Sequence, residues 1–328
     1  GAFALALFCA APAEGIQLEK LPISHRRTGG NLAVLNRSAT GEREDRDPPR
    51  LRGVLAKLRR SVEAFRLKTG NAKAVYTVIT GGYFEPTSYS EAVFEEDIDR
   101  LILTDNATMK ADGWQVVALN MDNQTANEVD MQLLSRRLKM FPHIYLAGYK
   151  RTLYVDGNVE IIAPVKDLFL KVGGSDANGE KRPDMAVYSF NRNITGEAKW
   201  IEDYVVRHHW MNRSAAHDLT TSQAAKYTAK YPSLEEKYPG TYYGKIIMRF
   251  RNDHIAAFAD IWFREFFHGV RRDQLSFQYA ALEANLTVDV IKRACFNTCK
   301  VYKDPSFTQW FRRHSESKHP SGIPSNAP

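Results

Sequence analysis

Cysteine is scarce in this sequence, and the apolar segment at its beginning is short. The 328 residues include 3 Cys, which is too few for the disulfide framework of a small secreted domain. Cys295 and Cys299 lie one helical turn apart, but no further Cys or His stands at ligand spacing, so the pattern excludes a structural zinc site. The opening segment, GAFALALFCA, is too short as it stands to cross a bilayer.

Two motifs of hydrolytic enzymes are also missing. The sequence contains no G-x-S-x-G nucleophile elbow and no His-rich metal motif. A lipid amidase would need either an activated nucleophile or a metal-bound water. The sequence therefore offers little support for that class of enzyme.

The body of the chain has no excess of either charge. Residues 1–73 hold 14 of the 45 Lys and Arg but only 7 of the 38 Asp and Glu, which accounts for the whole net charge of +7. A nucleic-acid-binding domain carries its positive face on the fold itself. The neutral body therefore argues against nucleic acid as a partner.

The composition is that of a globular protein. Hydrophobic residues make up 44% and charged residues 25%, with 17 Phe, 15 Tyr and 5 Trp. These values argue against global disorder, and the length suffices for one large core or two modest ones.

The N-terminal residues and the glycosylation sequons indicate a compartment. An apolar run followed by small residues, Ala10-Ala11-Pro12-Ala13, is typical of the end of a signal peptide or signal-anchor. Six asparagines precede Ser or Thr by two positions without an intervening Pro, an excess over the roughly two expected by chance. We therefore expect a lumenal protein of the secretory pathway with N-linked glycans. The sequons begin at Asn36, Asn106, Asn123, Asn193, Asn212 and Asn285.

Composition divides the chain into five segments. Residues 1–15 are the expected remnant of the signal peptide or signal-anchor, and 16–50 are polar enough for a flexible stem. Residues 51–73 have apolar positions at helical spacing, which predicts an amphipathic lead-in helix. The catalytic domain is expected over 74–314, followed by a disordered tail over 315–328.

The body shows an alternating α/β pattern. Predicted strands end in polar or glycine-rich turns, and ligands in such sheets bind outside the carboxyl ends of the strands. We therefore expect Gly81-Gly82, Asp105 and Asp156-Gly157-Asn158 to lie at one edge of a sheet. The expected strands are 74–80, 100–106, 113–120 and 151–162, the last running past the Asp-Gly-Asn break, and the segment 127–148 is expected to begin as a helix that Pro142 ends.

Five motifs in this order resemble the plant-type glycosyltransferase-like domain family, which includes a mucilage-related glycosyltransferase and a turgor-regulation protein also described as an alkaline ceramidase. The resemblance spans about residues 74–285. It implies a GT-A-like nucleotide-sugar-binding fold, with a mixed central sheet flanked by helices, Golgi residence with a possible type II membrane anchor, and a divalent metal such as Mn²⁺. The motifs are VYTVITGGY, LILTDN, RRLKMFPH, LYVDGNVEI and RRDQLSF.

Asp156, Gly157 and Asn158 form the predicted metal and diphosphate site. Departure of a nucleoside diphosphate requires neutralisation of its charge, which a divalent metal on oxygen ligands supplies. Asp156 and Asn158 stand two apart, on one side of an extended segment, and Gly157 permits close approach of the backbone. The alternative is a plain hairpin turn. His314 and His254 are candidates for a further metal ligand.

The remaining predicted site residues would bind the donor and acceptor. A structural alternative stays open for each of them. It is a tight turn for Gly81 and Gly82, an Asx-turn or helix cap for Asp105, a solvated basic face for Arg136, Lys139 and His143, and a capped helix start for Asp273 and Gln274. The predicted nucleotide-binding residues are Gly81, Gly82, Asp105, Arg136, Lys139 and His143, and the predicted catalytic residues are Asp273, as base or acceptor-orienting group, and Gln274, as donor-sugar ligand.

The sequence thus favours a lumenal glycosyltransferase that moves a sugar from a nucleotide sugar, preferably a UDP-sugar, to a glycan or glycoconjugate. A non-catalytic carbohydrate-binding domain on the same fold is the first alternative. A lipid amidase of the alkaline-ceramidase type is the second. Binding of a nucleoside diphosphate separates the first reading from both alternatives.

Overall fold

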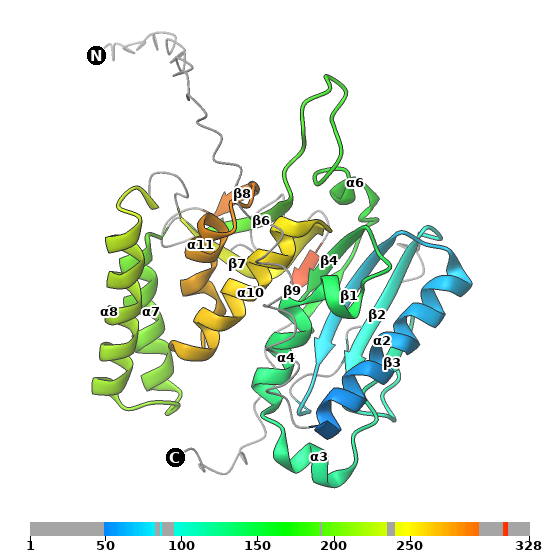
Figure 1. Cartoon of the computed structure of the whole chain (residues 1–328), viewed down its shortest axis with the longest axis horizontal. Coiled ribbons are helices and arrows are strands. Elements are labelled where there is room, and N and C mark those ends of the chain that lie inside the picture. The colour runs from blue at the N-terminus through cyan, green and yellow to red at the C-terminus, as the bar shows by residue number, and fades with distance from the viewer. Residues whose placement is uncertain are drawn as a thin grey trace, which may run out of the picture. The chain divides into compact units, whose positions relative to one another are not determined.

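A computed structural model describes residues 49–82, 86, 95–190, 192–234, 240–294 and 311–313. The predicted signal remnant, nearly all of the predicted stem, His314, the tail and the three cysteines lie outside these residues. Within them, seven strands form one sheet in the order β3-β2-β1-β4-β7-β6-β8 (Figure 1).

One half of the sheet is parallel. It consists of β1 (Lys73–Ile79), β2 (Ile98–Thr104), β3 (Gln115–Ala118) and β4 (Arg151–Val155). Parallel strands need crossover connections and bring their carboxyl ends to one edge. The turns that follow β1, β2 and β4 therefore share that edge, as predicted.

The other half contains the one reversed strand of the sheet. β7 (Thr241–Phe250) runs antiparallel to both β4 and β6 (Met185–Phe190), while β8 (Val288–Ala294) is parallel to β6. The α/β architecture predicted from the sequence, a mixed central sheet flanked by helices, is confirmed.

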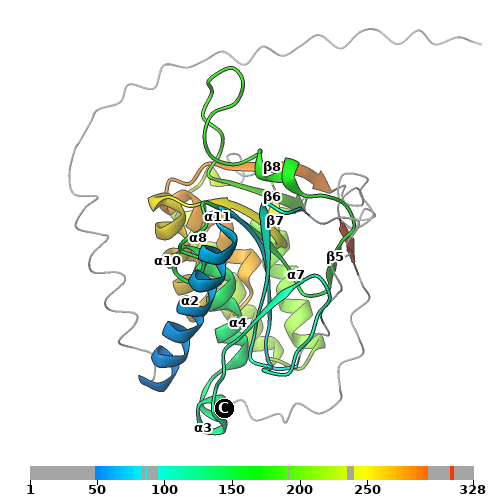
Figure 2. The same ribbon diagram turned by 90° about the vertical axis from the view of Figure 1, so that its right-hand side faces the viewer.

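The side chains of the sheet alternate between two cores because the strand period is two. Tyr76 and Tyr154 point into the larger core, with the helices, whereas Val75 and Leu153 point into the smaller one. Figure 2 shows α2, α4 and α10 on one side of the sheet and β5 on the other. The helices are α2 (Pro49–Thr69), α3 (Asn123–Glu128), α4 (Met131–Met140), α5 (Pro142–Tyr145), α6 (Lys166–Phe169), α7 (Ile194–Arg207), α8 (Arg213–Lys230), α10 (Asp253–His268) and α11 (Asp273–Glu283).

The predicted lead-in helix is confirmed as α2, and its apolar side belongs to the core of the domain. Leu51, Leu55, Leu58 and Val62 are buried in the larger cluster. The helix begins at Pro49, a residue that suits a helix start. It is therefore an integral layer over the sheet.

The helix expected to begin after residue 127 and to end at Pro142 is confirmed as α4, although it starts only at Met131. Asp130 caps a new helix, α4, by accepting a hydrogen bond from the Leu133 N–H at 3.0 Å. Pro142 opens a further short helix, α5, because proline is tolerated only in the first turn. The result is three short helices that change direction between residues 123 and 145.

The strand expected over 151–162 is also divided. β4 pairs with β1 and β7, whereas β5 (Val159–Ile161) pairs with β9 (Phe311–Arg313) in a separate small sheet. The hairpin alternative for Asp156-Gly157-Asn158 is therefore wrong, since β4 and β5 do not pair. The segment is a turn between two sheets, closed by the Val159 N–H to the Asp156 carbonyl at 2.9 Å.

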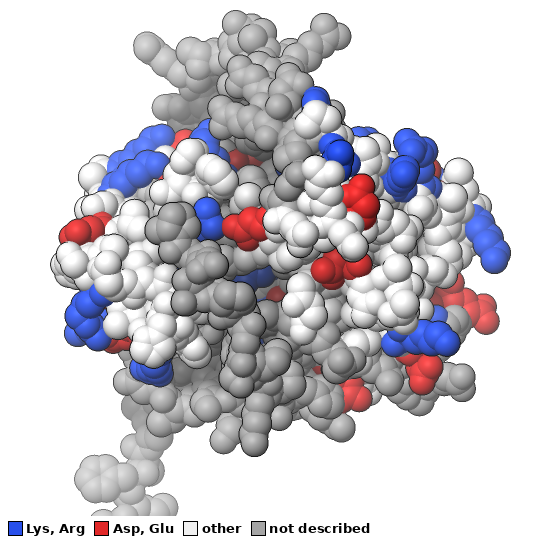
Figure 3. All heavy atoms as spheres, turned by 90° about the horizontal axis from the view of Figure 1, so that it is seen from below, with Lys and Arg blue, Asp and Glu red and all other residues white. Residues whose placement is uncertain are grey.

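The surface mixes both charges. On the face seen in Figure 3, Lys and Arg alternate with Asp and Glu over the described residues. In the part of the chain that the structure describes, no helix is both long and apolar enough to cross a membrane.

If α2 is part of the core, Leu58→Ala should lower the free energy of unfolding by about 2 to 5 kcal/mol, the usual cost of a large-to-small change at a buried site. The exposed neighbour Lys57→Ala is the matched control and should change it by less than about 0.5 kcal/mol. Urea denaturation of both variants measures the difference. Equal, small effects would show that α2 does not pack as described.

Candidate functional site

Three predicted site residues from distant parts of the chain meet beyond the carboxyl end of β4. The Lys139 ammonium lies 2.5 Å from Asp273 Oδ2 and 4.0 Å from Asp156 Oδ1. Lys139 comes from the last turn of α4, Asp156 follows β4, and Asp273 opens α11. A carboxylate in the first turn of a helix is favoured by the helix dipole.

Lys139 is almost completely enclosed. It is 2% exposed, and its ammonium lies 4.9 Å from the ring centre of Tyr154 and 6.0 Å from that of Trp262. Trp262 also donates from Nε1 to the Asp273 carbonyl at 2.7 Å. A Cβ on Gly244 would lie 3.3 Å from both the Lys139 Nζ and Asp273 Oδ2. Glycine at 244 therefore leaves room for the ion pair.

A second lysine, which was not predicted from the sequence, contacts the Asp-Gly-Asn turn. Lys245 Nζ donates to Asn158 Oδ1 at 3.1 Å and lies 3.7 Å from Asp156 Oδ2. The other Asp156 oxygen accepts from the Tyr154 hydroxyl at 2.6 Å. Asn158 is 3% exposed, and its Nδ2 has no hydrogen-bond partner among the described residues. Both N–H donors of this buried amide are thus left for a ligand.

The site is electrostatically coupled. Burial alone would raise the pKa of Asp156 and of Asp273, but nearby cations outweigh burial and place both pKa values below their ordinary range. Lys139 and Arg136 act on both acids, Lys245 on Asp156 and Arg272 on Asp273. Burial lowers the pKa of Lys139, and its two carboxylate neighbours only partly offset this.

These shifts disfavour Asp273 as the general base. A carboxyl whose pKa lies far below neutrality accepts a proton poorly. Asp273 is also 2% exposed, with Oδ2 held by Lys139 and 3.7 Å from Arg136 Nε. The geometry instead makes Asp273 the anchor that fixes the Lys139 ammonium.

Gln274, the other predicted catalytic residue, has an unused acceptor. Its Oε1 is buried and has no hydrogen-bond partner among the residues that the structure describes, although an unsatisfied buried carbonyl is costly. The prediction that Gln274 binds a sugar hydroxyl stays a prediction, and this free acceptor is compatible with it.

The residues predicted to hold a divalent metal do not fit one in this arrangement. A metal needs an open set of oxygen ligands, yet Lys245 lies against both Asp156 and Asn158. No group of three or more His, Cys, Asp or Glu able to hold a metal occurs among the described residues. His314 lies outside them, and His254 is placed beside Asp184, at 3.4 Å.

The predicted nucleotide-binding turn follows β1. Gly81 and Gly82 have φ of 67° and 65°, which favours glycine, and both are exposed. Asp105, after β2, accepts from the Gly81 N–H at 3.0 Å. Asp105 therefore fixes the turn across two parallel strands, and its role in nucleotide binding stays a prediction.

A shallow surface hollow adjoins the Asp-Gly-Asn turn, on the side of the sheet that carries Thr77 and Ile79. Trp114 and Ile102 form part of its wall, and Asp156 and Gly157 line it at the turn. The Thr77 hydroxyl on this wall is buried without a partner. The hollow thus combines an aromatic surface, an unused polar group and a neighbouring set of charges.

His143 is not brought to this site. It lines a different hollow with Lys150, at the start of β4, whereas Asp156 follows the end of that strand. Five residues at about 3.3 Å each separate these points by roughly 17 Å. Arg136, Lys139 and His143 stand three and four residues apart, but Pro142 opens a new helix before His143, so the helical spacing does not continue to the histidine.

The missed residues carry only weak sequence signals. Gly244 and Lys245 lie between apolar and aromatic residues in the segment TYYGKIIMRF. A lysine on a buried strand is rarely unpaired. That rule flags Lys245 as a candidate for an ion pair, but it does not identify Asp156 as the partner.

Comparison with protein-family models gives no match, and comparison with curated proteins gives none either. Two solved glycosyltransferase structures are similar to this chain. The WbbM bifunctional glycosyltransferase aligns at 10% identity and a TM-score of 0.35, over 67% of this chain and 38% of that chain. Mouse xyloside xylosyltransferase 1 aligns at 9% identity and a TM-score of 0.27, over 77% of this chain and 99% of that chain.

The ion pair between Lys139 and Asp273 predicts a pH-dependent stability. The folded-state pKa of Asp273 lies below the unfolded value of about 3.9. Its contribution is therefore complete above that value and is lost as the pH falls below it. Asp273→Asn should cost about 3 to 5 kcal/mol at pH 7, and less as the pH falls below about 4. Urea denaturation across this range measures the gap; a gap that does not change with pH would contradict the pairing.

Proposed function

We propose that this chain is a glycosyltransferase that binds a nucleotide-sugar donor at the carboxyl ends of β1, β2 and β4. The observation that carries the proposal is the convergence of Lys139, Lys245 and Arg136 on Asp156 and Asp273 beside an open hollow. Three cations face two carboxylates there, which leaves an excess of positive charge for an anionic ligand.

Each part of a nucleotide sugar has a counterpart in the site. The ring of Trp114 is assigned to the base of the nucleoside, and Lys245, beside Asp156, is assigned to the diphosphate. Charge develops on the diphosphate as the glycosidic bond breaks, and fixed cations in a partly enclosed site stabilise that charge. Gln274 Oε1 and Asn158 Nδ2 are the unused polar atoms assigned to the sugar and the phosphate.

The lysines take the role that the sequence analysis assigned to Mn²⁺. Lys245 contacts the same oxygens that were predicted to bind the metal. The proposal is therefore donor binding that needs no divalent ion. A bound Mn²⁺ would supply Lewis-acid stabilisation of the leaving group, but it would first require Lys245 to leave Asp156.

The finer parts of the proposal rest on the sequence. The UDP-sugar preference, the glycan or glycoconjugate acceptor and membership of the plant-type glycosyltransferase-like family follow from the resemblance. Golgi residence and a type II anchor follow from it and from the N-terminal residues. N-glycosylation is supported by exposure of the five described sequon asparagines; Asn193 and Asn212 use Oδ1 to cap helices, which leaves Nδ2 for a glycan.

A thermal-shift titration with UDP, GDP, CMP and their sugars tests the donor site. One nucleotide should raise the melting temperature, because a ligand that binds only the folded state stabilises it. Lys245→Met should weaken that binding by about tenfold to a hundredfold, the loss of one charge-assisted contact. Lys57→Ala, which removes an exposed lysine on α2, is the control and should leave binding unchanged.

Repeating the titration with EDTA and with added Mn²⁺ decides between lysine and metal. The proposal expects equal shifts in both conditions. A shift that appears only with Mn²⁺ would restore the metal reading of Asp156 and Asn158. Absence of any nucleotide-dependent shift would refute the donor site and favour a carbohydrate-binding domain or, as the second alternative, a lipid amidase.

A further inference from the structure

A buried arginine without a carboxylate partner lies on the helix-covered face of the sheet. Arg249 of β7 is 1% exposed, and its guanidinium is charged at any ordinary pH. Nη1 donates to the Tyr76 hydroxyl at 2.9 Å, but Nε and Nη2 have no hydrogen-bond partner within the described part of the chain. No described residue forms an ion pair with it. Buried charges are normally paired because desolvation is costly.

Arg249 lines a shallow hollow that is bounded by basic and neutral groups. Lys150 and Arg251 line it as well and are exposed, while the enclosed Thr152 and Ile255 complete much of the wall. No Asp or Glu occurs among the described residues that line it. The buried guanidinium and the two exposed cations therefore face one space.

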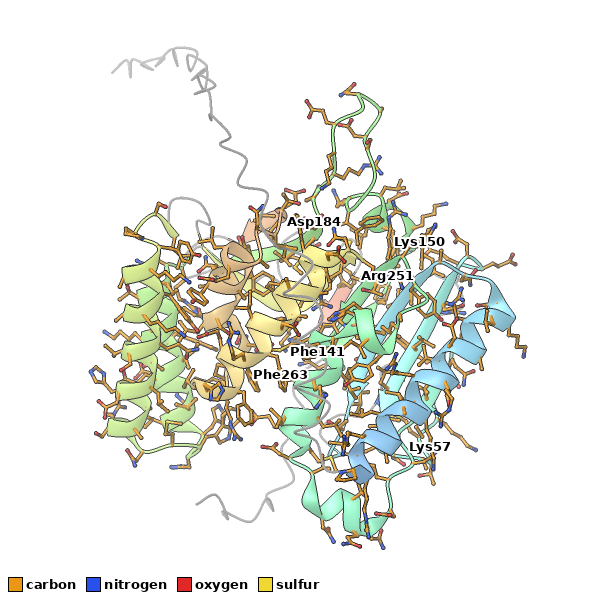
Figure 4. All side chains as sticks on the ribbon, viewed as in Figure 1. Lys57, Phe141, Lys150, Asp184, Arg251 and Phe263 are labelled. Carbon is orange, nitrogen blue, oxygen red and sulfur yellow. The ribbon has the colours of Figure 1, made fainter. Side chains whose placement is uncertain are left out.

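The two exposed cations are held side by side by strand pairing. The Arg251 N–H donates to the Lys150 carbonyl at 2.9 Å, which continues the register between β4 and β7. Figure 4 shows Lys150 and Arg251 next to one another, beside α10. Like charges directly opposite one another in a sheet repel, so the pairing favours an anion between them.

Acids on neighbouring elements are engaged elsewhere. Glu63 of α2 feels the charge of Arg251, but it pairs with Arg66 at 2.6 Å. Asp99 accepts from the Tyr149 hydroxyl at 2.5 Å and from Thr69 at 2.8 Å. Neither carboxylate enters the hollow as one of its lining residues.

We propose that this hollow is an oxyanion site for a phosphate group, either free phosphate or the phosphate of a small phosphomonoester. Arg249 supplies directed N–H donors from below, as guanidinium groups do for phosphate oxygens, and Lys150 and Arg251 close over the ligand from the solvent side. The site lies at the start of β4, and the donor site lies beyond its end. It requires no transferase activity.

Isothermal titration of the whole chain with inorganic phosphate and with glycerol phosphate, at constant ionic strength, tests the proposal. Constant ionic strength is needed because salt screens exposed charges. The double change Lys150→Ala with Arg251→Ala should weaken binding by at least about tenfold. Arg249→Met should abolish it, and the exposed double variant keeps the test valid if that buried variant fails to fold. Stronger binding of one ligand identifies the source of the phosphate group.

Two controls locate the binding. Lys57→Ala removes an exposed cation away from the hollow and should have no effect. Lys245→Met removes a cation of the donor site and should also leave phosphate binding unchanged. No binding by the wild type, an equal loss in Lys57→Ala, or loss only in Lys245→Met would each overturn the proposal. The last result would place phosphate in the donor site instead.

Discussion

The buried ammonium of Lys139 is the constraint on which the arrangement of the site depends. An enclosed ammonium is stable only with close carboxylate partners, and these come from the end of β4 and the start of α11. The requirement ties α4, β4 and α11 together, and Gly244 lets β7 pass close to the pair. One ion pair thus fixes the positions of elements that lie up to 134 residues apart in the sequence.

A short chain of hydrogen bonds connects the two proposed anion sites. Arg249 donates to the Tyr76 hydroxyl, and that hydroxyl donates to the Lys139 carbonyl at 2.8 Å. Cations therefore lie at both ends of β4, with Lys139 and Lys245 beyond its end and Arg249 beside its start. Fixed cations of this kind suit phosphate-bearing ligands, because they need no reorganisation when the ligand arrives.

Local patterns in the sequence predicted the parallel strands and α2, because apolar periodicity and strand ends are local signals. Lys139, Asp156 and Asp273 were separate site candidates by their motifs, and the fold brings them together. Distant pairing was not predictable in this way. The sequence left a hairpin open as the alternative for the Asp-Gly-Asn turn, and only the pairing of β5 with β9 rules it out. Lys245 was missed because its partner comes from another strand. His143 lies away from the site because Pro142 opens a new helix before it and the helical spacing does not continue.

Hydrogen–deuterium exchange with and without UDP is the sharpest test of the proposed donor site, because it reports where a bound nucleotide protects the backbone amides. If UDP binds there, exchange should slow after β1, β2 and β4, over residues 79–82, 104–106 and 155–159. Protection confined to residues 142–152 and 249–255, around the second hollow, would contradict it. Unchanged exchange throughout the chain at a high UDP concentration would also contradict the proposed donor site.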